Sequence, residues 1–238
     1  MKLNEYLTES FNSCLKNPLL FVPMAGAVVL VSLLSLLFSG TAIPFAGPMD
    51  AQTMAAGAGT ALGGAMVLSI LSTLITFLAH GMTIALGYDL ISGRPVSLRR
   101  GWESVLERIT PLVIAVILVG LLTGIGMVLL VLPGLIAAFF LMFTFAAVMV
   151  DREDALRALR SSIRMVANNF SAAFILFLVM IALGVIFMLV NMILGLIPVV
   201  GTLVAIVVSS VFSTFLTLVL LHAYLELRQA PATPDVEV

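Results

Sequence analysis

The stretch at residues 109–150 reads ITPLVIAVILVGLLTGIGMVLLVLPGLIAAFFLMFTFAAVMV and indicates the kind of fold most directly. It contains no charged residue. It is long enough for two membrane-spanning helices, because about 20 apolar residues cross a bilayer core of about 30 Å. Pro133 interrupts the stretch, and proline fits the first turn of a helix better than its interior, since it has no N–H group. We therefore predict helices at 111–131 and 133–150, joined by a tight turn.

Further uncharged runs predict four more spans. The first two runs hold one span each, and the last holds two, separated by a Gly- and Pro-containing turn. These spans are predicted at 19–38, 62–91, 170–194 and 199–222. The composition agrees, because 62% of the 238 residues are apolar and 10% are charged, against about 45–50% and about 25% in soluble domains. We predict an all-α, polytopic integral membrane protein with six transmembrane helices.

The basic residues indicate an orientation. With six spans, both termini and the second and fourth loops face one side, and all 11 Lys and Arg lie there. The opposite side has Asp50 as its only charge. Short loops rich in Lys and Arg stay in the cytoplasm. We therefore expect a multi-pass protein of the cytoplasmic (inner) membrane with both termini inside, one transmembrane domain at 1–228, and a disordered cytoplasmic tail at 229–238.

Three segments next to the spans have the pattern of amphipathic helices. In each, apolar residues recur every three or four positions, which places them on one helical face. The apolar positions are Leu7, Phe11, Cys14 and Leu15; Trp102, Val105, Leu106 and Ile109; and Leu156, Leu159, Ile163 and Val166. We expect these helices to lie in the headgroup layer, with Trp102, Arg157, Arg160 and Arg164 as interfacial anchors. Because a helical hairpin follows each, we expect three parallel repeats.

Part of this pattern resembles a known group of membrane proteins. The residues that carry the resemblance are Gly101-Trp102, Arg108, Leu132-Pro133-Gly134, Asp151 through Leu156, Ser161 and Asn168-Asn169. Over roughly residues 97–201 the chain resembles the membrane domain found beside glycerophosphoryl diester phosphodiesterases, and related uncharacterised six-helix membrane proteins of bacteria and archaea. The resemblance implies a six-helix membrane fold and no catalytic residues.

Polar side chains in the spans form two stripes that contain both histidines of the chain. The stripes are Ser72, Thr76 and His80, and Ser210, Thr214 and His222. One interpretation is a polar cavity open to the cytoplasm, with two titratable groups in its wall. The other is a pair of interfacial histidines that contact headgroups or neighbouring carbonyls. Two histidines without a nearby carboxylate or cysteine make a poor metal site, so we expect no metal and no cofactor.

Small residues recur every four positions in several spans, which allows helices to approach closely in lipid. The candidate packing positions are Gly59 and Gly63, Gly120 and Gly124, and Gly201, Ala205, Ser209, Ser213 and Thr217. We expect them to pack inside the bundle, with a homodimer face as the alternative.

The sequence contains none of the common nucleotide-binding, metalloprotease, dithiol or serine-hydrolase motifs, and the spans have no charge in their central parts. We therefore expect a non-enzymatic protein, a scaffold or accessory subunit that binds membrane lipids, another membrane protein or itself, and no nucleic acid. The alternative is a permease for a small neutral or lipid-like substrate that uses the polar stripes. An intramembrane enzyme would need a nucleophile, a base and an orienting group in one site.

Overall fold

The computed structural model of the protein describes residues 3–39, 51–194, 196–197 and 200–229. These residues form helices, turns and short connections, without a strand. The elements are α1 (Leu3–Lys16), the short 3-10 helix η1 (Pro18–Phe21), α2 (Val22–Ser39), α3 (Ala51–Ile91), α4 (Leu98–Glu107), α5 (Ile109–Leu129), α6 (Val131–Leu141), α7 (Thr144–Val150), α8 (Ala155–Asn168), α9 (Phe170–Leu194) and α10 (Val200–Gln229). The predicted all-α fold is confirmed.

Within the described residues, six helical segments are long and apolar enough to cross a membrane, so the protein is a multi-pass membrane protein. They are Pro18–Ser35, Met66–Ile91, Ile109–Leu129, Val131–Val150, Phe170–Leu194 and Val204–Gln229. The number and order of the predicted spans are thereby confirmed, and the fifth has the predicted bounds. The prolines of the third and fourth spans lie in the first turns of α5 and α6. A backbone N–H in the first turn has no partner within the helix, so a proline there removes no helical hydrogen bond.

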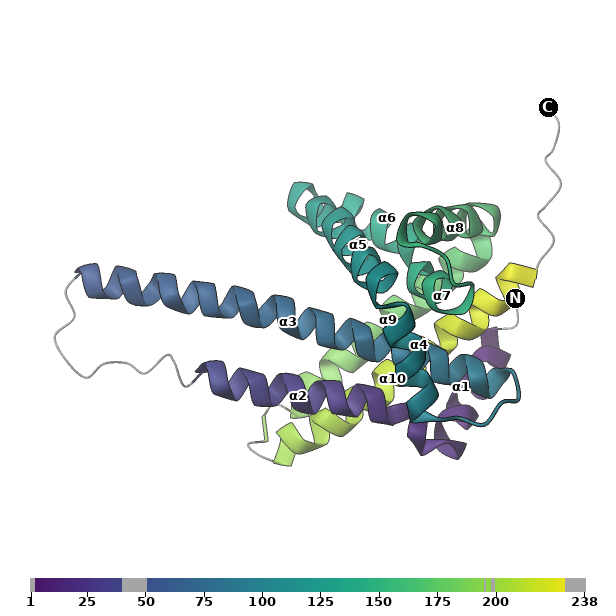
Figure 1. Ribbon diagram of the computed structural model, residues 1–238, viewed down its shortest axis with the longest axis horizontal. Coiled ribbons are helices and arrows are strands. Elements are labelled where there is room, and N and C mark those ends of the chain that lie inside the picture. Colours follow the sequence, from purple (N-terminus) through teal and green to yellow (C-terminus); the bar gives the residue numbers. More distant parts are fainter. Residues whose placement is uncertain (1–2, 40–50, 195, 198–199, 230–238) are drawn as a thin grey trace.

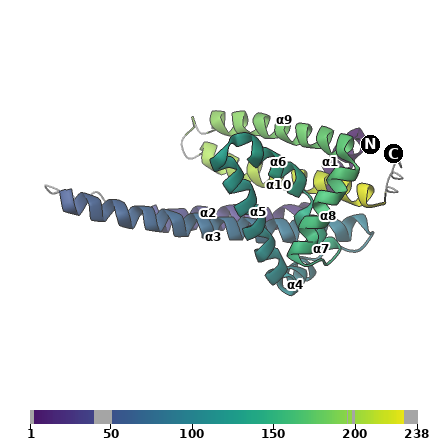
Figure 2. The same ribbon diagram turned by 90° about the horizontal axis from the view of Figure 1, so that it is seen from above.

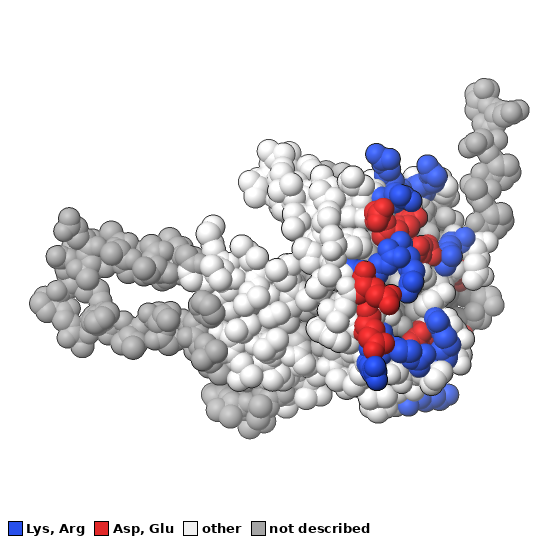
Figure 3. Space-filling view, in the orientation of Figure 1, with Lys and Arg blue, Asp and Glu red and all other residues white. Residues whose placement is uncertain are grey.

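Helices α2, α3, α9 and α10 follow a similar long direction, and α5 crosses this direction at an angle (Figure 1 and Figure 2). Helices α2 and α3 run side by side along it (Figure 1), and α9 and α10 run along it on the other side of the molecule (Figure 2). The short helices α1, α4, α7 and α8 gather at one end, together with the C-terminal part of α10. Charged side chains collect at the same end, in a band that crosses the direction of α2 and α3 (Figure 3). We call this the charged end.

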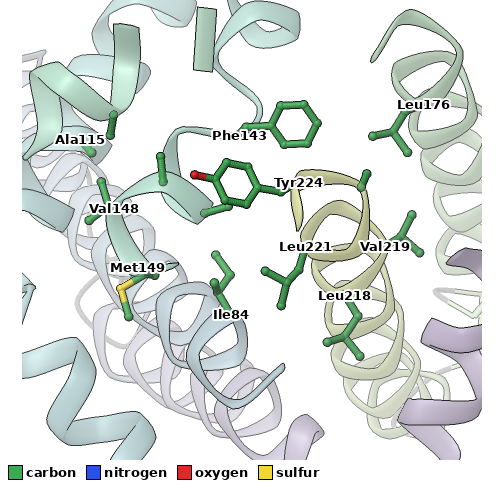
Figure 4. Packing of buried hydrophobic residues seen from close by; sticks show 14 of the residues in the cluster. Ile84, Ala115, Phe143, Val148, Met149, Leu176, Leu218, Val219, Leu221 and Tyr224 are labelled. Carbon is green, nitrogen blue, oxygen red and sulfur yellow. The ribbon is translucent and has the colours of Figure 1, made fainter. Parts of the chain in front are cut away.

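The hydrophobic core lies close to the charged end. Figure 4 shows Tyr224 of α10 beside Phe143, which lies between α6 and α7, and the two ring centroids are 5.9 Å apart. Ile84 of α3 and Leu221 of α10 belong to the same buried cluster. Farther from this end, many apolar side chains of the spans are exposed, as expected for helices that face lipid.

The fourth span is not the continuous helix predicted at 133–150. It begins at Val131 and is interrupted at Met142 and Phe143, between α6 and α7. The fully buried Ser162 of α8 fits against this break. Its hydroxyl donates a hydrogen bond to the Phe140 carbonyl at 2.8 Å and accepts one from the Phe143 N–H at 3.2 Å. A break inside a span is tolerated where other groups satisfy the freed backbone, and Ser162 does this here.

Helix α3, which contains the second span, is longer than the predicted helix. We expected a helix at 62–91, whereas α3 already begins at Ala51. The charged residue expected on the side opposite the basic residues, Asp50, lies outside the described residues. At the other end of the chain, α10 extends to Gln229, and the tail that we expected to be disordered lies outside the described residues from 230 onward.

Candidate functional site at the charged end

Helix α1 is attached to the bundle through polar contacts with His222 and a row of buried side chains. Tyr6, Ser10 and Cys14, spaced by four, are buried, and α1 packs against α10. The Nδ1 atom of His222 lies 3.1 Å from the Ser10 hydroxyl, and its Nε2 atom lies 3.8 Å from Oε2 of Glu9. Burial also raises the pKa of the Cys14 thiol to about 11. The sequence pattern identified Cys14 but missed Tyr6 and Ser10.

The other histidine makes a separate contact deeper in the bundle. His80 Nδ1 lies 3.0 Å from the hydroxyl of Thr217, which joins α3 to α10. The structure therefore brings His80 together with a residue of the predicted packing stripe and not with His222. Both histidines contact a hydroxyl of a neighbouring helix, and the two interpretations drawn from the sequence stay predictions.

The remaining predicted cavity residues take part in hydrogen bonds to backbone carbonyls, either through their hydroxyl or, for Ser72, through its own carbonyl. Thr76 donates to the Ser72 carbonyl at 2.8 Å, and Ser210 donates to the Ile206 carbonyl at 2.7 Å. Thr214, fully buried, reaches the Leu20 carbonyl of η1 at 3.5 Å. Hydroxyls that return to helix carbonyls in this way are internally satisfied, so they do not require a solute or water path.

The predicted packing glycines have different surroundings. A Cβ atom on Gly201 would lie 1.9 Å from the Leu194 carbonyl oxygen, so α10 can begin beside the end of α9 only with glycine there. In contrast, a Cβ on Gly120 or Gly124 would meet no atom within 4 Å. Their predicted role in packing within the bundle is therefore wrong, because both lie on the outward side of α5.

The close approach of α5 and α6 uses a glycine pair that we did not predict. A Cβ on Gly126 would lie 2.7 Å from the backbone nitrogen of Gly134. Of the other predicted positions, Ala205, Ser209 and Ser213 are half-buried on α10, and the Ser213 carbonyl accepts a hydrogen bond from the Thr217 hydroxyl. Gly59 and Gly63 belong to α3, in a part whose surroundings lie outside the described residues.

The link between α7 and α8 ties several elements together at the charged end. Asp151 accepts a hydrogen bond from the Tyr224 hydroxyl and lies 2.7 Å from Nη1 of Arg228, so it anchors the end of α10. The next residue, Arg152, has a φ of 57°, which is uncommon for a residue other than glycine. Its carbonyl accepts a bond from Arg108 at 2.7 Å, and its guanidinium lies 3.0 Å from Glu107.

The three surface helices align residue by residue. Each has a buried small residue, an exposed large apolar residue directly after it, and a buried residue one turn later. These triplets are Ser10, Phe11 and Cys14 in α1; Gly101, Trp102 and Val105 in α4; and Ser162, Ile163 and Val166 in α8. The residues that join the helices to the following spans also correspond, namely Asn17, Arg108 and Asn169. The predicted repeat is thus supported by matching burial in all three units.

The small residue of each triplet allows its helix to lie close to the bundle. In α4, a Cβ on Gly101 would lie 2.8 Å from the end of the Leu86 side chain of α3. In α8, the equivalent residue is Ser162, which completes the break in the fourth span. The large residue that follows points outward instead: Phe11, Trp102 and Ile163 are 56%, 50% and 43% exposed. Each surface helix therefore has a docked face and an outward apolar side chain.

Helix α8 also presents a row of basic side chains. Arg157, Arg160 and Arg164 are spaced by three and four and are exposed, which puts them on one side of the helix. Leu156, 61% exposed, and Ile163 form an apolar edge along this row. The interfacial anchors predicted from the sequence are thus all on outward surfaces of α4 and α8, where they could contact a headgroup layer.

This architecture defines a multi-pass α-helical membrane protein with amphipathic helices attached at one end of the bundle. The chain belongs to the family described as Domain of unknown function (DUF7847), which it matches over residues 1–227. No curated protein and no solved structure matches the chain. The family match covers all six spans up to the last turn of α10, and it includes all three surface helices.

Proposed function

We propose that this protein is a non-enzymatic scaffold or accessory subunit of the cytoplasmic membrane, which offers its three surface helices to lipid and to another membrane protein. Its charged end faces the cytoplasm, so both termini are inside, because the basic residues gather there. In this arrangement the band of charge in Figure 3 lies at the level of the inner-leaflet headgroups.

The observation that carries the proposal is the outward apolar residue shared by the three surface helices. Phe11, Trp102 and Ile163 occupy equivalent positions, and each is about half exposed although the helix that bears it is docked on the bundle. An exposed large apolar side chain beside basic residues is typical of a helix that lies in a membrane interface. Helices α1, α4 and α8 lie at the same end of the bundle, where each can rest on the same leaflet.

The polar stripes give less support to the alternative, a permease. A solute path needs polar groups that are free to exchange partners with the solute. The Thr76 and Ser210 hydroxyls donate to carbonyls of their own helices, and Thr214 bonds to η1. The contact between His80 and Thr217 likewise joins two helices. These contacts favour a structural role for the stripes.

The proposal is tested first with Trp102, the single tryptophan of the chain. In reconstituted vesicles, a nitroxide close to the lipid headgroup should quench Trp102 more strongly than one deep in the acyl chain, and aqueous iodide should quench it weakly. A tryptophan that iodide reaches freely would contradict the placement of α4 on the leaflet. Native mass spectrometry of the gently extracted protein then tests the accessory role, for which we expect a stoichiometric protein partner.

A further inference from the structure

The repeat alignment of α4 and α8 reveals a difference in charge at one position. In α4, Arg99 and Glu103 lie one turn apart and form an ion pair, with 2.8 Å between Nε and Oε1. The equivalent residues of α8 are Arg160 and Arg164. The position that carries the carboxylate in α4 therefore carries a second guanidinium in α8, and an internal ion pair is replaced by two like charges on one face.

Like charges one turn apart on a helix repel each other. Within the described residues, neither Arg160 nor Arg164 forms an ion pair. The three acidic residues that precede α8 have other contacts. Asp151 contacts Tyr224 and Arg228, and Glu153 accepts a hydrogen bond from Ser161 at 2.9 Å. Asp154 lies 3.4 Å from Arg157, the first arginine of the row, and leaves Arg160 and Arg164 without an ion pair within the described residues. The outward side of α8 is thus positive, and a bound anion would relieve the repulsion.

The neighbouring side chains indicate where that anion comes from. Leu156 and Ile163 form an exposed apolar edge beside the arginines, as they would if this edge entered the acyl-chain boundary while the guanidinium groups stayed among headgroups. A guanidinium binds phosphate oxygens through two parallel hydrogen bonds. A ligand with both a phosphate and an acyl chain matches this surface, because the phosphate can bind the arginines and the acyl chain can contact the apolar edge.

We propose that the outward face of α8, with Arg160 and Arg164 beside Leu156 and Ile163, is a binding site for the headgroup of an anionic phospholipid. The site rests on the proposed function in one respect, namely that the surface helices lie on a leaflet. The face of α4 is its natural control, because Glu103 already neutralises Arg99 there.

The experiment exchanges the charge at the position of Glu103 in α4 and Arg164 in α8. Arg164→Glu gives α8 the arginine and glutamate pair of α4, and Glu103→Arg gives α4 the two arginines of α8. The full-length protein and both variants are mixed in detergent with equal amounts of dioleoyl phosphatidylglycerol and dioleoyl phosphatidylcholine. Native mass spectrometry then gives the ratio of the two lipids retained on the protein.

We expect the wild-type protein to retain phosphatidylglycerol preferentially. Each basic charge near an anionic surface contributes about a fivefold preference. The preference should therefore fall by more than fivefold in Arg164→Glu and rise in Glu103→Arg. Equal retention of the two lipids by the wild type, or an unchanged preference in either variant, would overturn the proposal. If Arg164→Glu does not elute as a single folded species, the Arg160→Gln/Arg164→Gln variant replaces it.

The Trp102 measurement keeps this result separate from the proposed function. If Trp102 is quenched from the bilayer while the lipid ratio stays equal, the surface helices rest on the membrane and the assignment of the headgroup is wrong. If Trp102 is quenched from water, the placement on the leaflet is wrong whatever the ratio.

Discussion

The hydroxyl of Tyr224, in the last part of α10, donates a hydrogen bond to Oδ2 of Asp151, the residue that directly follows α7. The two residues are 73 positions apart in the chain, and the Tyr224 ring is almost completely buried beside Phe143. Asp151 lies at the same time 2.7 Å from Arg228. This contact connects the end of the sixth span to the end of the fourth.

The Tyr224→Phe variant should therefore lose stability while keeping the packing of the ring. A hydrogen bond to a charged group contributes about 1.5–3 kcal/mol, so we expect a loss of about 2 kcal/mol in the free energy of unfolding, measured in detergent. Tyr88→Phe is the matched control. The Tyr88 ring lies 5.2 Å from the Arg94 guanidinium, and this variant keeps both the ring and the guanidinium. Equal losses in the free energy of unfolding of the two variants would show that the hydrogen bond to Asp151 does not stabilise the protein.

The Ser162→Ala variant tests the break in the fourth span. Without the hydroxyl, the Phe140 carbonyl and the Phe143 N–H lose their partner in α8. An unsatisfied buried backbone group costs about 1–3 kcal/mol, and we expect a loss of stability in that range on thermal unfolding. Ser171→Ala, an exposed serine of α9, serves as the control. Wild-type stability in Ser162→Ala would mean that other groups complete the break.

Two glycines of α5 should respond differently to the same substitution. In Gly126→Ala the added methyl group meets the backbone of Gly134 at 2.7 Å, so α5 and α6 must separate. In Gly120→Ala the methyl group enters open space, and alanine favours the helix by up to about 1 kcal/mol. Melting temperatures in detergent should fall for Gly126→Ala and stay level or rise for Gly120→Ala. The reverse order would contradict the described contact between α5 and α6.

The thiol of Cys14 should react slowly in the folded protein. Burial raises its pKa from 9.0 to about 11, so the reactive thiolate at pH 8 is reduced about a hundredfold. The same shift makes the free energy of unfolding depend on pH. Burial of the neutral thiol stabilises the fold fully below pH 9, and this contribution is lost as the pH rises through 11. Maleimide labelling followed by mass spectrometry should be fast in SDS and slow in mild detergent. Comparable rates in both would place Cys14 at the surface.

The six spans could be predicted because their signals are local. Gaps between charges set the length of each helix, and prolines at 111 and 133 mark first turns of α5 and α6. Helical spacing also places Trp102 and Val105 on one apolar face, but it does not show that Val105 is buried against the bundle while Trp102 is half exposed. The resemblance to the phosphodiesterase-associated membrane domain, by contrast, stays a prediction.

Features that depend on contacts between distant residues could not be predicted. Nothing in the residues around Met142 and Phe143 predicts a break in the helix, because the partner that stabilises it is Ser162 on another element. Likewise, the spacing of Gly120 and Gly124 permits close packing but does not say which side of α5 meets a neighbour. The partners of His80 and His222 also lie far away in the chain, on α10 and α1.

The break in the fourth span has a consequence for how the protein is made. Its backbone is completed by a serine that lies 19 residues beyond Phe143, so this serine is synthesised after the span itself. When the fourth span leaves the translocon, the Phe140 carbonyl and the Phe143 N–H still lack the partner that α8 will supply. Maturation of this half of the protein therefore waits until residue 162 has emerged from the ribosome and α8 has folded back against the inserted helices.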